Sequence, residues 1–178
     1  STNTYGFRFA GKQKIDEQWS VGYIGSYAHQ TDGGNSPLEY DANYYLVEGS
    51  VTRSEWGTFG VGYEVLGSDN GQAAFRTPLA TLHAFNGWAD VFLATPAVGL
   101  EDLYVYYANT LPYDIKGKVV YHHYMAEDGS AKLGDEIDLV ASKSINKHIS
   151  VLVKYAEYFG ASQITDRRKF WVQMEIKF

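Results

Sequence analysis

Hydrophobic and polar residues alternate strictly along residues 168–178. The apolar residues occupy one set of alternate positions and the polar ones the other, namely Phe170, Val172, Met174, Ile176 and Phe178 against Lys169, Trp171, Gln173, Glu175 and Lys177. Strict alternation of this kind indicates a β-strand whose two faces meet different surroundings. Because all the apolar groups are large, the pattern favours lipid on one face and water on the other.

The same alternation recurs along most of the chain and predicts nine strands in all. Each predicted strand is about ten residues long or longer, which is the length that a tilted strand needs to cross a hydrocarbon core of about 30 Å. The segments besides 168–178 are Thr4–Gln13, Gln18–Gln30, Ala42–Ser54, Gly57–Asp69, Glu101–Pro112, Ile115–Glu127, Gly134–Ile145 and His148–Gly160.

The predicted connections alternate between short turns and longer polar loops. The short turns are Lys14–Glu17, Ser54–Trp56, Tyr113–Asp114 and Asn146–Lys147, and the longer loops are Thr31–Asp41, Asn70–Leu100, Asp128–Leu133 and Ala161–Asp166. Outer-membrane barrels have short periplasmic turns and longer outer loops. We therefore predict an all-β fold, an antiparallel up-and-down transmembrane β-barrel, with residues 1–178 as a single domain and 70–100 as a long inserted loop.

The odd strand number bears on the size of the barrel. Bacterial single-chain barrels usually have an even number of strands, with both ends in the periplasm. With nine strands the first would begin on the outer side, so we expect this chain to be the C-terminal portion of a larger barrel. A wrong strand assignment near residues 1–13 is the alternative.

Composition and charge argue against several other classes of protein. The chain contains no cysteine, which excludes a disulfide framework and a thiolate metal site. Its formal net charge of −6 argues against nucleic acid as a partner. His122 and His123 are adjacent in a predicted strand, so they point to opposite faces and cannot chelate one ion together. The sequence has no catalytic or phosphate-binding motif, and we expect no enzyme activity, no cofactor and no resident metal.

Four sequence blocks between residues 62 and 104 are distinctive. They are residues 62–71 (Gly-Tyr-Glu-Val-Leu-Gly-Ser-Asp-Asn-Gly), 75–83 (Phe-Arg-Thr-Pro-Leu-Ala-Thr-Leu-His), 85–92 (Phe-Asn-Gly-Trp-Ala-Asp-Val-Phe) and 99–104 (Gly-Leu-Glu-Asp-Leu-Tyr). These blocks resemble the alginate export family of outer-membrane porins. The resemblance implies a monomeric barrel of about eighteen strands in the bacterial outer membrane, of which this chain would form roughly the C-terminal half. It also implies that Phe178 belongs to the signal read by the outer-membrane barrel assembly machinery.

Charged residues at the inward positions of the predicted strands nearly cancel in sign. The cations are Arg8, Lys12, Lys116, Lys118, Lys154, Lys169 and Lys177, and the anions are Glu48, Glu64, Asp102, Glu136, Asp138 and Glu175. A conduit for a polyanion should present a dominant ring of Arg and Lys, so these residues do not favour alginate as the solute. We interpret most of the charges as pairing with one another across strands and holding water.

Glu48 and Glu64 form one unusual pair in this set. If the hairpin between them turns at Trp56, the two carboxylates stand directly opposite each other and repel unless a cation lies between them. That cation would be an Arg or Lys of a neighbouring strand, or else a bound cation or cationic solute. A register displaced by two residues would make the pair diagonal instead.

The connection at residues 70–100 is the expected place for specificity, because long loops in compact proteins are usually functional or disordered and this one is too apolar for disorder. A short helix after Pro78 is predicted by the spacing of Leu79, Leu82, Phe85, Trp88 and Phe92. We expect the connection to fold inward as a constriction and to present Arg76, His83, Asn86, Trp88 and Asp90 to solutes. The alternative is a lid packed on the outer rim.

These patterns favour a passive outer-membrane channel, through which small hydrophilic solutes or saccharides diffuse past the long loop. Two alternatives stay open at this point. One is a soluble lipocalin-like barrel that binds a small ligand, in which the apolar residues point inward and the polar ones meet water. The other is a purely structural barrel with a blocked lumen, which the sequence does not distinguish from a channel.

Overall fold

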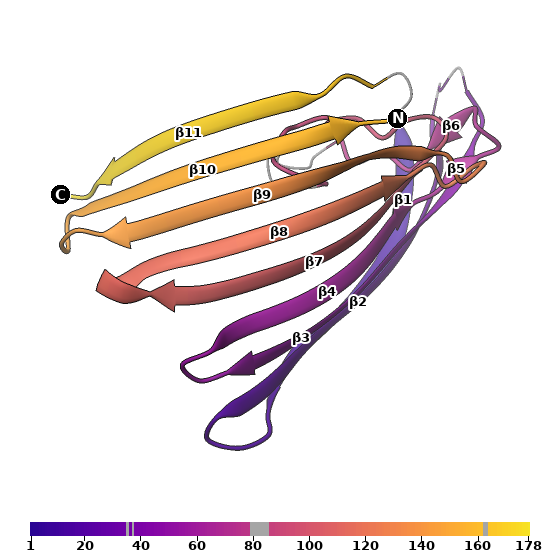
Figure 1. Cartoon of the computed structure of the whole chain (residues 1–178). Helices are drawn as coiled ribbons and strands as arrows, with labels where there is room; N and C mark the ends of the chain where they lie inside the picture. The colour runs from indigo at the N-terminus through magenta and orange to yellow at the C-terminus, as the bar shows by residue number, and fades with distance from the viewer. Residues whose placement is uncertain (35, 37, 79–85, 162–163) are drawn as a thin grey trace.

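In the computed structural model the chain forms a nine-stranded antiparallel sheet, in which the strands follow one another in chain order (Figure 1). The structure describes residues 1–34, 36, 38–78, 86–161 and 164–178. The strands of this sheet are β1 (Thr2–Lys14), β2 (Trp19–Asp32), β3 (Asp41–Arg53), β4 (Gly57–Leu66), β7 (Leu100–Leu111), β8 (Ile115–Met125), β9 (Lys132–Ser144), β10 (Ile149–Gly160) and β11 (Arg167–Ile176). Two smaller strands, β5 (Ser68–Asp69) and β6 (Ala73–Ala74), pair with each other, and the 3-10 turn η1 (Pro112–Asp114) joins β7 to β8.

All nine strands predicted from the alternation are present, with ends that differ from the predicted ones by at most three residues. The all-β and antiparallel parts of the fold prediction are therefore confirmed. Within the described part of the chain, β1 and β11 each pair with one neighbour only, so the sheet is open and has two free edges. The sequence did not predict the β5–β6 hairpin, because strands of two residues carry no alternation.

Short and long connections lie at opposite ends of the sheet (Figure 1). The short connections 15–18, 54–56, 112–114 and 145–148 lie at the same end as the C-terminus. The longer connections 33–40, 67–99, 126–131 and 161–166 lie at the end where the N-terminus is found. The predicted alternation of short turns and long loops is confirmed.

One face of the sheet is apolar and exposed across its whole width. The register brings apolar residues of this face together, with Val153 opposite Val172 and Val61 opposite Val105. Large fractions of these side chains are exposed, 65% for Val172 and 44% for Val61. A soluble barrel requires the reverse arrangement, in which residues such as Val61 and Ile176 form a dry core, but Ile176 is 48% exposed.

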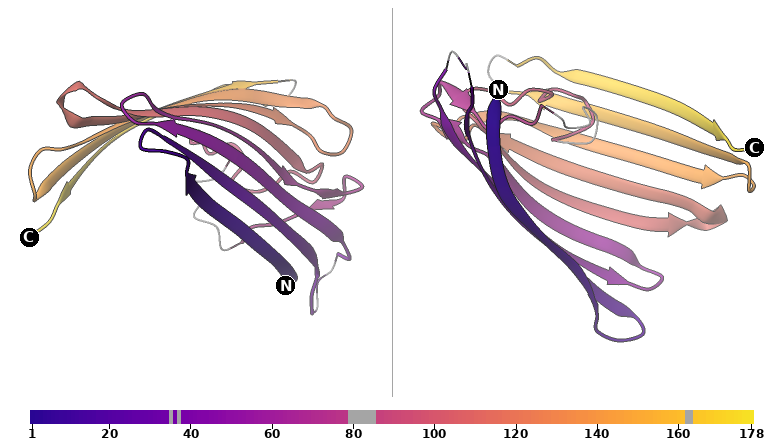
Figure 2. Two further views of the ribbon diagram at one scale, coloured as in Figure 1. Left: turned by 90° about the horizontal axis from the view of Figure 1, so that it is seen from below. Right: turned by 180° about the vertical axis from the view of Figure 1, so that it is seen from behind.

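The opposite face carries the polar residues and is partly covered by the 67–99 connection, which lies on the inner side of the arched sheet (Figure 2). Buried residues of the connection pack there against buried residues of the strands, and this core includes Phe75, Ala89, Phe92, Leu66, Leu100, Tyr124, Ala156 and Tyr158. The sheet itself thus covers the apolar groups of the connection. No helix in the described part of the chain is long and apolar enough to cross a membrane.

Candidate functional site

The residues predicted to face the interior lie together on the covered, polar face of the sheet. One row of paired positions runs from Arg8 through Glu64 to Asp102. A second row runs from Lys12 to Asp138 and on to Lys169. Because paired residues of neighbouring strands share a face, the same register places the whole predicted set there, namely Arg8, Lys12, Glu48, Glu64, Asp102, Lys116, Lys118, Glu136, Asp138, Lys154, Lys169 and Glu175.

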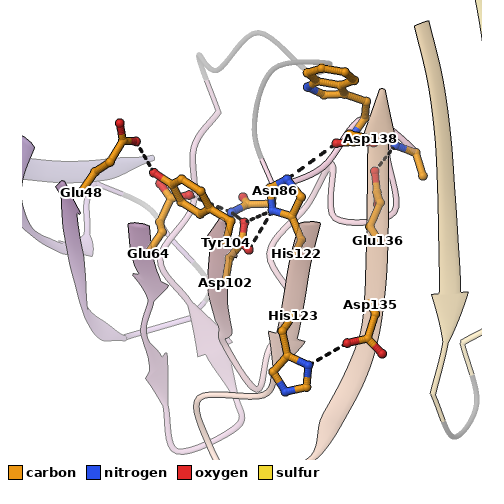
Figure 3. Close-up of polar contacts among 12 residues, drawn as sticks. Glu48, Glu64, Asn86, Asp102, Tyr104, His122, His123, Asp135, Glu136 and Asp138 are labelled. Atoms are coloured by element: carbon orange, nitrogen blue, oxygen red, sulfur yellow. Dashed lines mark hydrogen bonds and ion pairs between the residues drawn. The ribbon is translucent and has the colours of Figure 1, made fainter. Parts of the chain in front are cut away.

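Five carboxylates of this set gather beside the 67–99 connection, and we call them the acidic cluster. They are Glu48 on β3, Glu64 on β4, Asp102 on β7, and Glu136 and Asp138 on β9 (Figure 3). The basic residues lie around them, with Arg8 and Lys12 on β1, Lys116 and Lys118 on β8, Lys154 on β10 and Lys169 on β11. The structure therefore separates charges that the sequence only showed to balance.

Glu48 and Glu64 are diagonal neighbours rather than a directly opposed pair. Glu48 stands opposite Gly62, and Glu64 stands opposite Leu46. The hairpin closes with a turn at residues 54–56, so it is centred on Glu55, one residue earlier than the predicted centre. The predicted direct opposition was wrong for this reason, and the diagonal alternative is the one observed.

Tyrosine hydroxyls, not cations, satisfy these two glutamates. Glu48 accepts hydrogen bonds from the hydroxyls of Tyr104, at 2.5 Å, and Tyr106, at 3.0 Å (Figure 3). Glu64 accepts one from the hydroxyl of Tyr44 at 2.6 Å. Within the described residues no Lys or Arg forms an ion pair with either glutamate, so the expected cross-strand ion pairing is not observed here.

Asn86 links the connection to two strands of the sheet. Its side-chain amide donates a hydrogen bond to Glu64 at 2.9 Å and makes a longer contact of 3.5 Å with Asp102. Asn86 is buried, and Asp102 is only 1% exposed. The amide of the predicted constriction residue is thus used to fix the connection above β4 and β7.

His122 lies between two carboxylates of the acidic cluster. Its Nδ1 atom is 2.9 Å from Asp102 Oδ1, and its Nε2 atom is 3.6 Å from Asp138 Oδ2. His123 points to the other face, as predicted, where its Nδ1 atom lies 2.7 Å from Asp135 (Figure 3). The sequence excluded joint chelation by the two histidines but did not reveal that His122 bridges β7 and β9.

Glu136 and Asp138 hold the backbone of the connection. The N–H of Ala89 donates to Glu136 Oε1 at 2.6 Å, and the N–H of Trp88 donates to Asp138 Oδ2 at 3.1 Å. Both carboxylates are 0% exposed. Their other oxygens, Oε2 of Glu136 and Oδ1 of Asp138, receive no hydrogen bond within the described structure.

The start of the connection is anchored by Gln30 on β2, a residue that is 1% exposed. Its side-chain carbonyl accepts a hydrogen bond from the Arg76 N–H at 2.7 Å and another from the Tyr40 hydroxyl at 2.8 Å. Its amide donates to the Arg76 carbonyl at 2.9 Å. Gln30 therefore pairs with the backbone of Arg76 as a neighbouring strand would, while the Arg76 side chain stays exposed.

The far part of the connection is held by basic residues of β11. The Asp90 carboxylate pairs with Lys169, and the Asp90 carbonyl accepts a hydrogen bond from Arg167 at 2.6 Å. The predicted site residue His83 and most of the predicted helix lie in 79–85, outside the described residues. The connection is described again from residue 86, and no helix occurs between residues 86 and 99.

A cavity of about 480 Å³ lies between the connection and the polar face. Three members of the acidic cluster line it, namely Glu48, Glu64 and Asp102. Its aromatic lining comes from Tyr44, Trp88, Tyr104 and Tyr106, and its cations are Arg8 and Lys118. Pockets of this size accommodate small molecules. The arrangement offers a polar solute carboxylate acceptors, aromatic faces and, at the sides, two cationic donors.

Several residues that build this site were not singled out from the sequence. Tyr104 and Tyr106 alternate in phase with Asp102 and therefore share its face, so their position, but not their pairing with Glu48, was readable in the sequence. Gln30 gave no comparable signal, because its partner Arg76 is distant in sequence.

Comparison of the chain with protein-family models, with curated proteins and with solved structures finds no match. Within the described residues, no group of three or more His, Asp or Glu side chains is arranged to hold a metal ion. The functional argument therefore rests on the geometry of the sheet and its covered face.

Proposed function

We propose that this chain forms part of an outer-membrane channel through which small hydrophilic solutes diffuse. The observation that carries the proposal is the division of the sheet into two unlike faces. An exposed apolar face as wide as the sheet suits contact with lipid, and the opposite face lines a polar cavity. A soluble ligand-binding barrel is disfavoured because residues such as Val61 and Ile176 are exposed.

The 67–99 connection is proposed to be the constriction of this channel. It lies on the inner side of the sheet and is fixed at both ends, by Gln30 at Arg76 and by the acidic cluster at residues 86–89. A segment held by several hydrogen bonds to buried side chains keeps a fixed position. We therefore infer a stationary constriction, not a mobile gate.

The two free edges of the sheet support a larger barrel. Unpaired edge strands expose backbone N–H and C=O groups, and these groups are not tolerated in a bilayer unless the barrel closes. We propose that further strands pair with β1 and β11 in the complete protein. The sequence resemblance to the alginate export family agrees with this proposal, although the fold alone does not name the solute.

Conductance measurements on the full-length protein test the channel. The purified protein is inserted into planar lipid bilayers, and its conductance is compared with that of a variant in which residues 77–92 are replaced by a short Gly-Ser linker. We expect an open channel whose conductance rises when the constriction is removed. A matched control shortens the 126–131 connection, which lies at the same end of the sheet.

The possible outcomes separate the alternatives. A native protein that inserts into lipid without conducting would support the structural barrel with a blocked lumen. Conductance that does not change when residues 77–92 are removed would contradict the constriction. A protein that stays in solution without lipid or detergent would contradict the membrane assignment altogether.

A further inference from the structure

We propose that the acidic cluster makes the channel selective for small cations, including organic solutes that carry an ammonium group. The cluster consists of Glu48, Glu64, Asp102, Glu136 and Asp138, as defined above. This inference rests on the proposed channel function and names the class of solute that its constriction admits.

The negative charge of the cluster is not neutralised by the chain. Within the described residues no Lys or Arg forms an ion pair with any of the five carboxylates. Their donors are tyrosine hydroxyls, the Asn86 amide, two backbone N–H groups and the imidazole of His122. Neutral donors stabilise a carboxylate but leave its charge in place.

Two buried oxygens of the cluster lack any donor, and this is a second observation that points to a missing positive group. They are Oε2 of Glu136 and Oδ1 of Asp138, on side chains that are 0% exposed. Buried polar atoms normally have hydrogen-bond partners. A proton shared by this pair would satisfy both atoms, and, even with His122 also protonated, three of the five negative charges would remain.

The cluster opens onto the cavity through Glu48, Glu64 and Asp102. The two cations that line the same cavity, Arg8 and Lys118, lie on β1 and β8, on either side of these strands. Because the carboxylates are partly or fully buried, their field is screened less than that of exposed charges. The path beside β3, β4 and β7 therefore attracts cations and repels anions.

Aromatic rings around the cluster already bind ammonium groups of the chain itself. The Lys118 ammonium lies 4.5 Å from the ring centre of Tyr106, and the Lys154 ammonium lies 4.9 Å from that of Trp88. Ammonium groups are attracted to the faces of such rings. A solute with an ammonium group would find the same combination of rings and carboxylates in the cavity.

Reversal potentials of the full-length protein in planar bilayers test the proposal with a KCl gradient. We expect a permeability ratio of potassium to chloride above one. In a Glu48→Gln, Glu64→Gln variant the ratio should fall by about two- to threefold for each charge removed. The matched control is Asp135→Asn, because Asp135 lies on the opposite face, paired with Lys132 and His123, and should leave the ratio unchanged.

Each outcome bears on one of the two proposals. Absence of conductance would overturn the channel itself, whereas conductance with a ratio of one or below, or an unchanged ratio in the double variant, would overturn only the cation selectivity. If the double variant fails to fold, the native protein still provides a test. Its ratio should fall as ionic strength rises from about 0.1 M to about 1 M, because the Debye length shortens from about 10 Å to about 3 Å. A ratio that does not depend on salt would contradict the proposal.

Discussion

Val172 lies near the centre of β11 on the exposed apolar face, so it gives a direct test of which solvent that face meets. It is four residues from Ile176 and five from Arg167, the two ends of the strand. At about 3.3 Å per residue it is therefore at least about 13 Å from either end along the strand. The next residue, Gln173, stands opposite Leu152 on the polar face.

Substitution by arginine at these two adjacent positions should have very different costs. An arginine on the lipid face at mid-bilayer costs about 2–4 kcal/mol. Val172→Arg should therefore lower the folding equilibrium constant by about 30-fold to about 700-fold, at about 1.4 kcal/mol per factor of ten. Gln173→Arg places the same side chain in a wet interior, where exposed substitutions usually change stability by no more than about 0.5 kcal/mol.

Refolding of the full-length protein from urea into phospholipid vesicles measures both costs. Folded and unfolded species are separated by the mobility of unheated samples on SDS gels, and the fraction folded is followed against urea concentration. Equal destabilisation by the two substitutions, or a larger loss for Gln173→Arg, would refute the assignment of the apolar face to lipid.

Three further predictions concern single elements of the structure. Gln30→Ala removes the anchor at the start of the 67–99 connection and leaves buried backbone groups unpaired, so it should cost about 1–3 kcal/mol and speed proteolysis of the connection; unchanged protection would argue against the anchor. Gly62→Ala places a methyl group against the Tyr104 ring and should lower thermal stability, whereas Gly49→Ala, with open space at its Cβ position, should not, and similar melting temperatures for both would contradict the packing. Deletion of Phe178 should reduce the amount of protein in the outer membrane, and an undiminished yield would remove its role as an assembly signal.

The strands were predictable because their alternation is a local property of the sequence. In β11, for example, every residue from Phe170 to Ile176 shows its face by its polarity, so neither long-range pairing nor loop structure was needed. The predicted inward set also came out on one face, because parity along each strand decides the face once the strand is recognised.

Long-range contacts in the site were not predictable in the same way. The relation of Glu48 to Glu64 depends on the centre of one turn, and a shift from Trp56 to Glu55 was enough to change it. The hydrogen bond from the Ala89 N–H to Glu136 joins segments that are far apart in the sequence, and no local pattern marks it. Closure of the sheet depends on strands that would pair with β1 and β11.

The orientation of the two faces in a membrane is the central claim, and collision rates of spin labels test it most directly. Single cysteines are placed in turn at positions 169–176 of the full-length protein in bilayers, where this chain has no cysteine of its own. The account predicts that oxygen, which concentrates in lipid, collides most at positions 170, 172, 174 and 176, and that a water-soluble nickel complex collides most at 169, 171, 173 and 175. Positions 170, 172, 174 and 176 shielded from both reagents, as in a dry core, would contradict it.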